Sequence, residues 1–235
     1  MDAIVMAAGE GRRLRPLSER WPKPVLPIDG RPVLGTLLRE LAAAGIERAT
    51  IVTGHLAEEV EAFVGDGAAW GLEVAFARQP RPDGSADAVR RALRAGARLP
   101  TLVSAADTVY SAGDVARFAV AFASSGAAGG LAYRRGHEPT PAKPGVRVAG
   151  GNVQTVYDLE RANPLTSAPL WALGVELVPY LDDLPGPPYE LKDAYQPAID
   201  AGLAIVGVAI GKTRDLTDPL DLVEENFPYL ATTTT

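Results

Sequence analysis

The sequence contains no cysteine, only two histidines and two methionines, and just 6% aromatic residues. Without cysteine the chain can form neither disulfide bonds nor thiolate metal sites, as is usual in a reducing compartment. No apolar run approaches the roughly 18 residues that a membrane-spanning helix needs. The N-terminus (MDAIVMAAGEG) carries an acidic residue and too short an apolar run for a signal peptide. We therefore expect a cytoplasmic protein without a membrane partner.

The chain also lacks the positive charge that would suit a nucleic acid. Its formal net charge is −6, and no long basic stripe is present. Arginines instead gather locally, at Arg12, Arg13, Arg15 and Arg20. A local cationic cluster in an acidic chain indicates a small anionic ligand, although a solvated surface gives the same pattern.

What the sequence does contain is a large apolar fraction, 47% of 235 residues, which is enough for one sizeable core. We expect one domain over residues 1–230 and a disordered tail at 231–235. In the first half, strands are predicted at 3–7, 49–53, 72–77 and 101–105, and helices at 34–41, 57–64, 85–95 and 115–122, with Ser85 as an N-cap. This alternation predicts right-handed crossovers and a mostly parallel sheet.

The second half shows a different pattern. A hairpin is predicted at 146–156, strands at 170–177 and 204–210, and a helix at 219–226. Residues 191–201 have helical character but include Pro197, which must kink the helix, start it or argue against it.

The most informative stretch is AAGEGRRLRPLSERWPK, from Ala7 to Lys23, which directly follows the first predicted strand. Ligands of parallel sheets bind at the carboxyl ends of strands. Gly9 and Gly11 let backbone N–H groups approach an anion closely, and arginine matches phosphate geometry. Lys23 stands between two prolines that restrict its backbone. The combination predicts a phosphate-binding loop, although its spacing matches neither the dinucleotide fingerprint nor the P-loop motif.

This opening resembles the sugar-phosphate nucleotidylyltransferase family, whose members begin with a strand, a Gly-x-Arg-Leu-x-Pro-Leu loop and a Pro-Lys-Pro. Here the loop is residues 11–17, the Pro-Lys-Pro is 22–24, and the match continues through 25–34. The resemblance implies that the loop, with Ala8, Gly9 and Gly11, binds the nucleotide. It also implies that Arg13 holds the triphosphate and that Lys23 neutralises charge at the reacting phosphates.

Two aspartates are the expected metal ligands. Asp107 follows the predicted strand 101–105, and carboxylates are the ligands that Mg²⁺ prefers; capping a turn or helix is the alternative. The family has a metal-binding aspartate here after a glycine, which Ala106 replaces. Asp215 resembles the first aspartate of the family's closing Asp-hydrophobic-Gly-Thr-Pro-x-Asp-Leu segment. Because Thr217-Asp218 replaces the Gly-Thr, Asp218 is a rival ligand.

Further site residues come from the same resemblance. Residues matching the family's nucleotide-binding segment are Gln79, Gly84 and Ser85. Residues matching its sugar-phosphate segments are Arg161, Gly174 and Glu190.

Together these features predict a three-layer α/β/α sandwich with a Rossmann-like, mostly parallel sheet and a small β-rich lid. The resemblance implies a magnesium-dependent reaction of a nucleoside triphosphate with a sugar 1-phosphate that yields an NDP-sugar and pyrophosphate. Two alternatives are transfer to another phosphate, such as choline or inositol phosphate, and a non-catalytic nucleotide-sensing module. Because no hexapeptide-repeat segment is present, a bifunctional enzyme is not expected.

Overall fold

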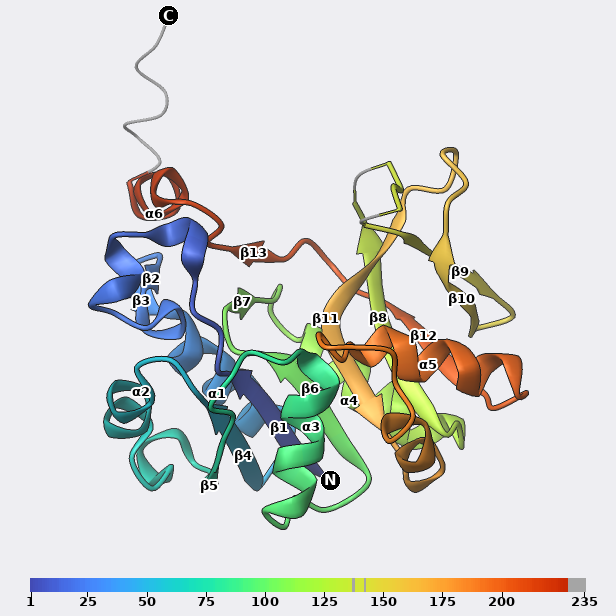
Figure 1. Cartoon of the computed structure of the whole chain (residues 1–235), viewed down its shortest axis with the longest axis horizontal. Helices are drawn as coiled ribbons and strands as arrows, with labels where there is room; N and C mark the ends of the chain where they lie inside the picture. Colours follow the sequence, from blue (N-terminus) through green and yellow to red (C-terminus); the bar gives the residue numbers. More distant parts are fainter. Residues whose placement is uncertain (137, 142, 228–235) are drawn as a thin grey trace, which may run out of the picture.

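The computed structural model of the chain describes residues 1–136, 138–141 and 143–227. Residues 228–230 of the predicted domain, and the predicted tail at 231–235, lie outside this described part. One nine-stranded sheet receives strands from both halves of the chain, and helices cover it on both faces (Figure 1). None of the helices formed by the described residues is long and apolar enough to cross a membrane.

The sheet has the strand order β5-β4-β1-β6-β11-β8-β12-β10-β9. Its strands are β1 (Asp2–Ala7), β4 (Arg48–Thr53), β5 (Glu73–Arg78), β6 (Thr101–Ala105), β8 (Gly129–Arg135), β9 (Gly145–Ala149), β10 (Asn152–Asp158), β11 (Leu165–Leu173) and β12 (Ile205–Ala209). β5, β4, β1 and β6 are parallel neighbours, and β12 is parallel to β8. β11 alone separates these two parallel groups, because it is antiparallel to both β6 and β8.

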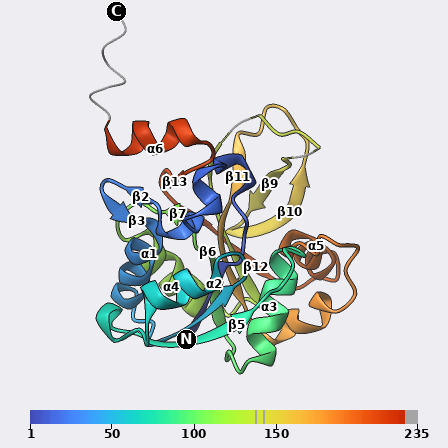
Figure 2. The ribbon, with the colours of Figure 1, turned by 60° about the vertical axis from the view of Figure 1, so that its left-hand side comes forward.

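Helices form the two outer layers. One face of the sheet packs against α1 (Val33–Ala43), α2 (Ala57–Val64) and α4 (Asp114–Ser125). The other face packs against α3 (Ser85–Arg94) and α5 (Leu191–Asp200). Figure 2 shows the two helical layers on opposite sides of the strands. The predicted three-layer α/β/α sandwich is therefore confirmed.

The strand directions determine which strand ends lie together at one edge of the sheet. Seven strands run the same way, namely β5, β4, β1, β6, β8, β12 and β9, so their carboxyl ends point to one edge. Outside the main sheet, the chain forms two small two-stranded sheets. They are β2 (Pro27–Ile28) with β3 (Arg31–Pro32), and β7 (Thr108–Val109) with β13 (Arg214–Asp215). The last helix, α6 (Pro219–Asn226), lies beside β2 and β3 (Figures 1 and 2).

For the second half, one sequence prediction needs correction and two become more definite. The small β-rich addition is the β9–β10 hairpin at the edge of the sheet, while β8, β11 and β12 belong to its centre. The strand predicted at 170–177 is β11, which ends at Leu173 and is followed by a 3-10 helix over Val175–Leu181. Pro197 lies inside α5; it is exposed, and the helix continues past it.

β8 itself was not predicted at all. It begins with Gly129-Gly130, and glycine disfavours strands in general. Here the two glycines are required by packing. A Cβ at Gly129 would lie 2.4 Å from a methyl group of Leu177, and one at Gly130 would lie 3.2 Å from Phe118. Tertiary neighbours therefore override the local preference.

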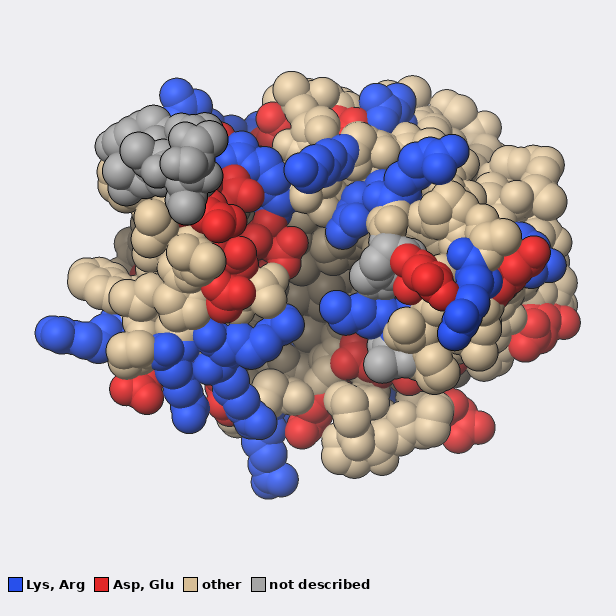
Figure 3. All heavy atoms as spheres, turned by 90° about the horizontal axis from the view of Figure 1, so that it is seen from above, with Lys and Arg blue, Asp and Glu red and all other residues tan. Residues whose placement is uncertain are grey.

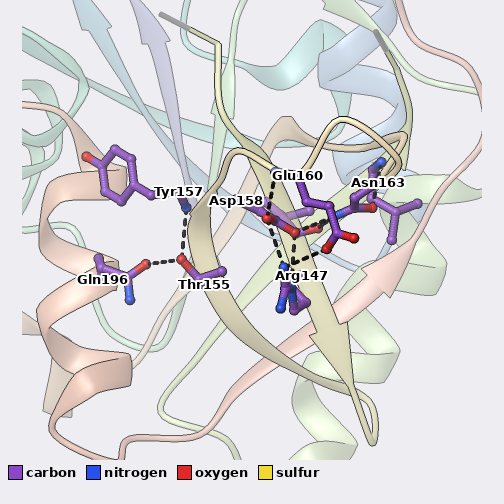
Figure 4. A network of polar contacts seen from close by, with 9 residues as sticks. Arg147, Thr155, Tyr157, Asp158, Glu160, Asn163 and Gln196 are labelled. Carbon is purple, nitrogen blue, oxygen red and sulfur yellow. Dashed lines mark hydrogen bonds and ion pairs between the residues drawn. The ribbon is translucent and has the colours of Figure 1, made fainter. Parts of the chain in front are cut away.

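A polar network holds the β9–β10 hairpin in shape (Figure 4). Arg147 donates two hydrogen bonds of 3.1 Å to the carboxylate of Asp158 and a third, of 2.9 Å, to Glu160. Asn163 donates to Asp158 at 2.7 Å, which closes the turn after β10. Hydrogen bonds from Arg147 in particular hold the pKa of the Asp158 carboxyl at about 2. On the other side, Gln196 of α5 accepts hydrogen bonds from β10.

This network predicts a pH-dependent contribution to stability. The folded-state pKa of Asp158 is depressed to about 2, whereas an unfolded aspartate titrates near ~3.9. The stabilisation is therefore fully present above about pH 4, and it is lost as pH falls towards 2. We expect Asp158→Asn to lower Tm by roughly 3–6 °C at pH 7.

Thermal unfolding from pH 7 to 2 checks this prediction, because the gap between wild type and Asp158→Asn should narrow as the pH falls. Asp183→Asn is the control, since Asp183 is exposed and makes no ion pair within the described part of the chain. A gap that stays constant over this range would contradict the assignment.

Candidate active site

A cavity of about 430 Å³ opens at the carboxyl rim of the sheet. Seen from above, the molecule is hollowed at its centre, and Lys and Arg side chains border the hollow (Figure 3). Every residue predicted to bind the nucleotide lines this cavity, as do both predicted catalytic residues and Asp107. These residues are Ala8, Gly9, Gly11, Arg13, Lys23, Gln79, Gly84, Ser85 and Asp107.

The loop after β1 requires glycine at position 11. Gly11 has a φ of +60°, and a Cβ there would lie 3.3 Å from the Cβ atoms of both Lys23 and Ser18. The chain then turns through a 3-10 helix over Arg12–Leu14, whose Leu14 is fully buried. The loop is thus anchored on one side and pressed against Lys23 on the other.

The arginines of this loop differ in their partners. Arg12 forms an ion pair with Glu10 at 2.7 Å, and Arg15 lies 3.9 Å from the same carboxylate. Arg13 forms no ion pair with any described residue, and it lines the cavity. Arg13 is therefore the guanidinium of this loop that is left to meet an anion.

Lys23 and Asp107 both line the cavity, and their side chains form an ion pair. Pro22 and Pro24 are both buried, and Lys23 begins a 3-10 helix over Lys23–Val25, so the backbone that carries the ammonium is well held. Asp107 comes just after β6, where the N–H of Ala106 donates to β1 at 3.0 Å. The side chains are only 15% and 31% exposed, so the two charges balance each other in a partly buried place.

The backbone of Asp215, near the end of the chain, lies beside that of the residue after Asp107. β13 pairs with β7 so that Asp215 lies opposite Thr108, the residue after Asp107. Next to it, Arg214 forms ion pairs with Asp29 at 2.6 Å and with Glu225, and these hold β13 in position. The side chain of Asp215 is exposed and, unlike those of Leu216 and Thr217, does not line the cavity. That Asp107 and Asp215 share a metal ion therefore stays a prediction.

Asp218, the alternative metal ligand, caps a helix instead. Asp218 is the N-cap of α6, and its carboxylate accepts a hydrogen bond of 2.9 Å from the N–H of Leu220. The carboxylate of Asp221 accepts a hydrogen bond of 3.0 Å from the backbone N–H of Asp218, which completes a capping box. The Asp218 carboxylate is thus used in capping its helix. Among the described residues, the Asp215 carboxylate accepts one long hydrogen bond of 3.3 Å, from the hydroxyl of Thr217.

The donors at this place suit a magnesium ion. Among the described residues, no three His, Cys, Asp or Glu side chains cluster closely enough to hold a metal. Mg²⁺ does not need such a cluster, because one or two carboxylates together with phosphate oxygens suffice. Asp107 already faces a cation, the ammonium of Lys23. Asp107 and Asp215 are therefore the residues that could hold the ion when phosphates are present.

Gln79 is oriented by a partner that the sequence did not reveal. Its amide nitrogen donates to the carbonyl of Gly84 at 3.0 Å and to Asp87 at 2.9 Å, which leaves its carbonyl oxygen as an acceptor. Burial acts to raise the pKa of Asp87, but hydrogen bonds from Arg91 and Gln79 hold it below its usual value. An ionised Asp87 thus fixes which end of the Gln79 amide is free.

The start of α3 differs slightly from the prediction. Gly84, and not Ser85, occupies the N-cap position; Gly84 has a φ of +104°, and a Cβ there would lie 2.3 Å from the carbonyl oxygen of Tyr189. The Ser85 hydroxyl instead donates to Glu190 at 2.5 Å and accepts from the N–H of Leu191 at 2.8 Å. The beginnings of α3 and α5 are joined in this way.

A second cavity, of about 410 Å³, lies beside the first and shares Met6 and Ser85 with it. Glu190, predicted on the sugar side, lines it. Three cations that sequence reasoning missed also line it: Arg134, Lys143 and Lys192. Arg134 was missed because β8 was missed; its position at the end of that strand is the signal that would have identified it.

Two residues predicted to bind the sugar phosphate do not line either cavity. The Arg161 side chain is 87% exposed and forms an ion pair of 3.0 Å with Glu138. Gly174 follows β11, which runs antiparallel, so Leu173 pairs with Thr101 at the amino end of β6. Gly174 therefore lies at the opposite edge of the sheet and cannot contact a ligand at the carboxyl rim.

Comparison with known proteins supports the same reading of the site. Residues 2–160 match the family model described as nucleotidyl transferase. The chain is 44% identical over 85 residues to mannose-1-phosphate guanylyltransferase of Mycobacterium tuberculosis, covering 36% of this chain and 24% of that protein. It is 30% identical over 244 residues to the bifunctional protein GlmU of Paracidovorax citrulli, covering 95% and 49%.

The fold is shared with solved structures at lower identity. A Bacillus anthracis protein assigned as a glucose-1-phosphate thymidylyltransferase superimposes with a TM-score of 0.84 at 18% identity, over 100% of this chain and 96% of that one. The matched regions span from 20% to 50% of the curated relatives' own lengths. The family match covers well over half of the chain and includes the glycine–arginine loop, Lys23 and Asp107. The chain therefore belongs to the nucleotidyl transferase family.

Proposed function

We propose that the chain transfers a nucleotidyl group from a nucleoside triphosphate to a sugar 1-phosphate, giving an NDP-sugar and pyrophosphate. The observation that carries the proposal is the ion pair of Lys23 and Asp107 at the edge of the glycine–arginine loop. The names of the relatives, which include mannose-1-phosphate guanylyltransferase, agree with this reaction class. A pyrophosphate-release assay with a panel of nucleoside triphosphates and sugar phosphates tests it.

The two adjoining cavities suggest how the substrates are arranged. The first, with the loop amides, Arg13 and Gln79, suits the triphosphate and the base. The second, with Glu190, suits the acceptor. Met6 and Ser85 line both cavities, so an acceptor bound in the second would lie next to a triphosphate bound in the first. Such placement converts a reaction between two solutes into a step within one complex.

In the proposed step, an oxygen of the acceptor's phosphate attacks the α-phosphorus of the triphosphate. A bond forms between that oxygen and the α-phosphorus, the bond to the bridging oxygen of the β-phosphate breaks, and pyrophosphate leaves with the electron pair. The acceptor phosphate is already ionised, so no general base is needed. Lys23 and Arg13 stabilise the negative charge that develops on the phosphate oxygens.

The proposal includes Mg²⁺, which Asp107 and Asp215 would hold with phosphate oxygens. When bound, the ion supplies Lewis-acid stabilisation of the phosphates. Residues of the chain position the positive charge at the reacting phosphates. Asp107 releases the Lys23 ammonium from its ion pair as anionic substrate enters, and the tightly held backbone around Lys23 keeps that ammonium at the reacting end of the cavity.

The first prediction concerns Lys23. Lys23→Gln should lower kcat by about 100- to 1,000-fold, because a charge that acts on the transition state is removed. The fold should be retained, since the side chain lies in a cavity wall and not in the core. Lys212→Gln is the matched control, because Lys212 is exposed and lines neither cavity. A folded Lys23→Gln variant with wild-type kcat would remove Lys23 from the mechanism.

The second prediction concerns the metal. Chelation with EDTA should abolish pyrophosphate release, and Asp215→Asn should raise the Mg²⁺ concentration needed for half-maximal rate by about tenfold or more. Asp218→Asn is the control, because asparagine caps a helix about as well as aspartate. Magnesium titrations of the three proteins measure this. Equal magnesium dependence of wild type and Asp215→Asn would count against Asp215 as a ligand.

The third prediction separates the two cavities. Gln79→Ala should change relative kcat/KM among nucleoside triphosphates by roughly tenfold, with little change among acceptors. Glu190→Gln should do the reverse, because Glu190 lines only the second cavity. Gln154→Ala, on the exposed side of β10, is the control. Equal effects of both variants on both substrate panels would refute this division. Gly84 is not a useful probe, because any side chain there would displace α3.

A further inference from the structure

The second cavity carries more positive charge than a neutral sugar ring requires. Its lining includes three cations, Arg134, Lys143 and Lys192, and one carboxylate, Glu190. The carboxylate is already engaged by the Ser85 hydroxyl at 2.5 Å, and within the described part of the chain it forms no ion pair with the three cations. This local excess stands against a net charge of −6 for the whole chain. Lys192 lies 5.2 Å from the centre of the Tyr157 ring, but none of the three cations forms an ion pair with a described residue. The lining of this cavity therefore has positive charge to offer to an anionic group.

Arg134 is the most constrained of the three. It lies near the carboxyl end of β8, opposite Thr166 of β11. Its Nε atom is buried and has no hydrogen-bond partner, and the guanidinium forms no ion pair with any described residue. Burial raises the pKa of the Tyr110 hydroxyl, and the charge of Arg134 acts weakly against this rise. A partly buried guanidinium without a partner is costly unless a ligand supplies an anion.

The positions of the charges indicate which part of the acceptor they face. Lys23 and Asp107, where the phosphates react, line the first cavity only. Arg134, Lys143 and Lys192 line the second cavity only. They come from β8, from the chain just before β9, and from the first turn of α5, so they surround the space from separate elements. They therefore face the body of the acceptor and not its reacting phosphate.

We propose that the acceptor is an acidic sugar 1-phosphate, which carries a carboxylate on the sugar in addition to the phosphate, and that Arg134 binds this carboxylate. Guanidinium and carboxylate match in geometry, and their paired hydrogen bonds are among the stronger ones in proteins. Lys143 and Lys192 add attraction for the same group. This inference rests on the proposed function, because it names the substrate class of the same site.

The test is pyrophosphate release with matched acceptors. Glucose 1-phosphate and N-acetylglucosamine 1-phosphate serve as neutral sugars. Glucuronic acid 1-phosphate and an N-acetylglucosamine 1-phosphate with an ether-linked carboxylate serve as acidic ones, so that the carboxylate is offered at two ring positions. We expect kcat/KM to be about 10- to 100-fold higher for at least one acidic sugar than for its neutral counterpart.

Variants then assign the preference to Arg134. Arg134→Gln should remove the preference by lowering kcat/KM for the acidic sugar while leaving that for the neutral sugar within about twofold. Arg134→Lys should keep part of it, because the charge remains but the two-pronged contact is lost. Arg135→Gln is the control, since Arg135 is the next residue of β8, is exposed and lines neither cavity. Lys192→Gln, which changes a side chain outside the core, provides a second readout if Arg134→Gln fails to fold, and it should also reduce the preference.

The outcomes separate this inference from the proposed function. If neutral sugar phosphates are used as well as every acidic one, the inference is overturned and the transferase function stands. If Arg134→Gln lowers the rates with neutral and acidic sugars equally, Arg134 binds the shared phosphate and the inference is again overturned. If no sugar phosphate supports pyrophosphate release with any nucleoside triphosphate, both proposals fail.

Discussion

The ion pair between Lys23 and Asp107 is the contact around which the site is built. It exists because β1 and β6 are parallel neighbours, so the loop that leaves β1 and the turn that leaves β6 emerge at the same edge. The buried prolines on either side of Lys23 hold its backbone there, and the loop packs so closely that a Cβ at Gly11 would lie 3.3 Å from the Cβ of Lys23. A cation and a carboxylate that balance each other in a partly buried place are ready to exchange partners when a charged substrate enters.

Contacts between distant segments arrange the rest of the site around this pair. Arg214, held by Asp29 and Glu225, places β13 against β7 and thereby sets Asp215 beside the end of β6. On the opposite side, the Ser85–Glu190 hydrogen bond joins the starts of α3 and α5; Ser85 lines both cavities, and Glu190 lines the second. A substrate that moved either helix would act on both cavities, because these helix ends are tied to each other.

The charge of the molecule is distributed in keeping with anionic substrates. The chain is acidic overall, yet Lys and Arg side chains border the central hollow (Figure 3). Several of these cations are satisfied within the protein, such as Arg12 by Glu10 and Arg147 by Asp158. Arg13 and Arg134 are not paired in the described part of the chain, and each lines one of the cavities. The unpaired arginines thus mark where the structure leaves charge for ligands.

The amino-acid sequence by itself determined the local features of this protein. Apolar periodicity predicted α2, β6 and α6 to the residue, and the loop from Gly9 to Lys23 identified the phosphate end of the site, because glycine dihedrals and proline restraints act over a few neighbouring residues. The tertiary structure alone decided which residues share the rim. Pairing of β13 with β7 brings Asp215 beside the residue after Asp107. Asp218 caps α6, and Arg134 lines the second cavity. Gly174 lies at the opposite edge of the sheet because β11 is antiparallel to its two neighbours. The direction of a strand depends on its pairing with segments distant in the sequence, and no local pattern encodes that pairing.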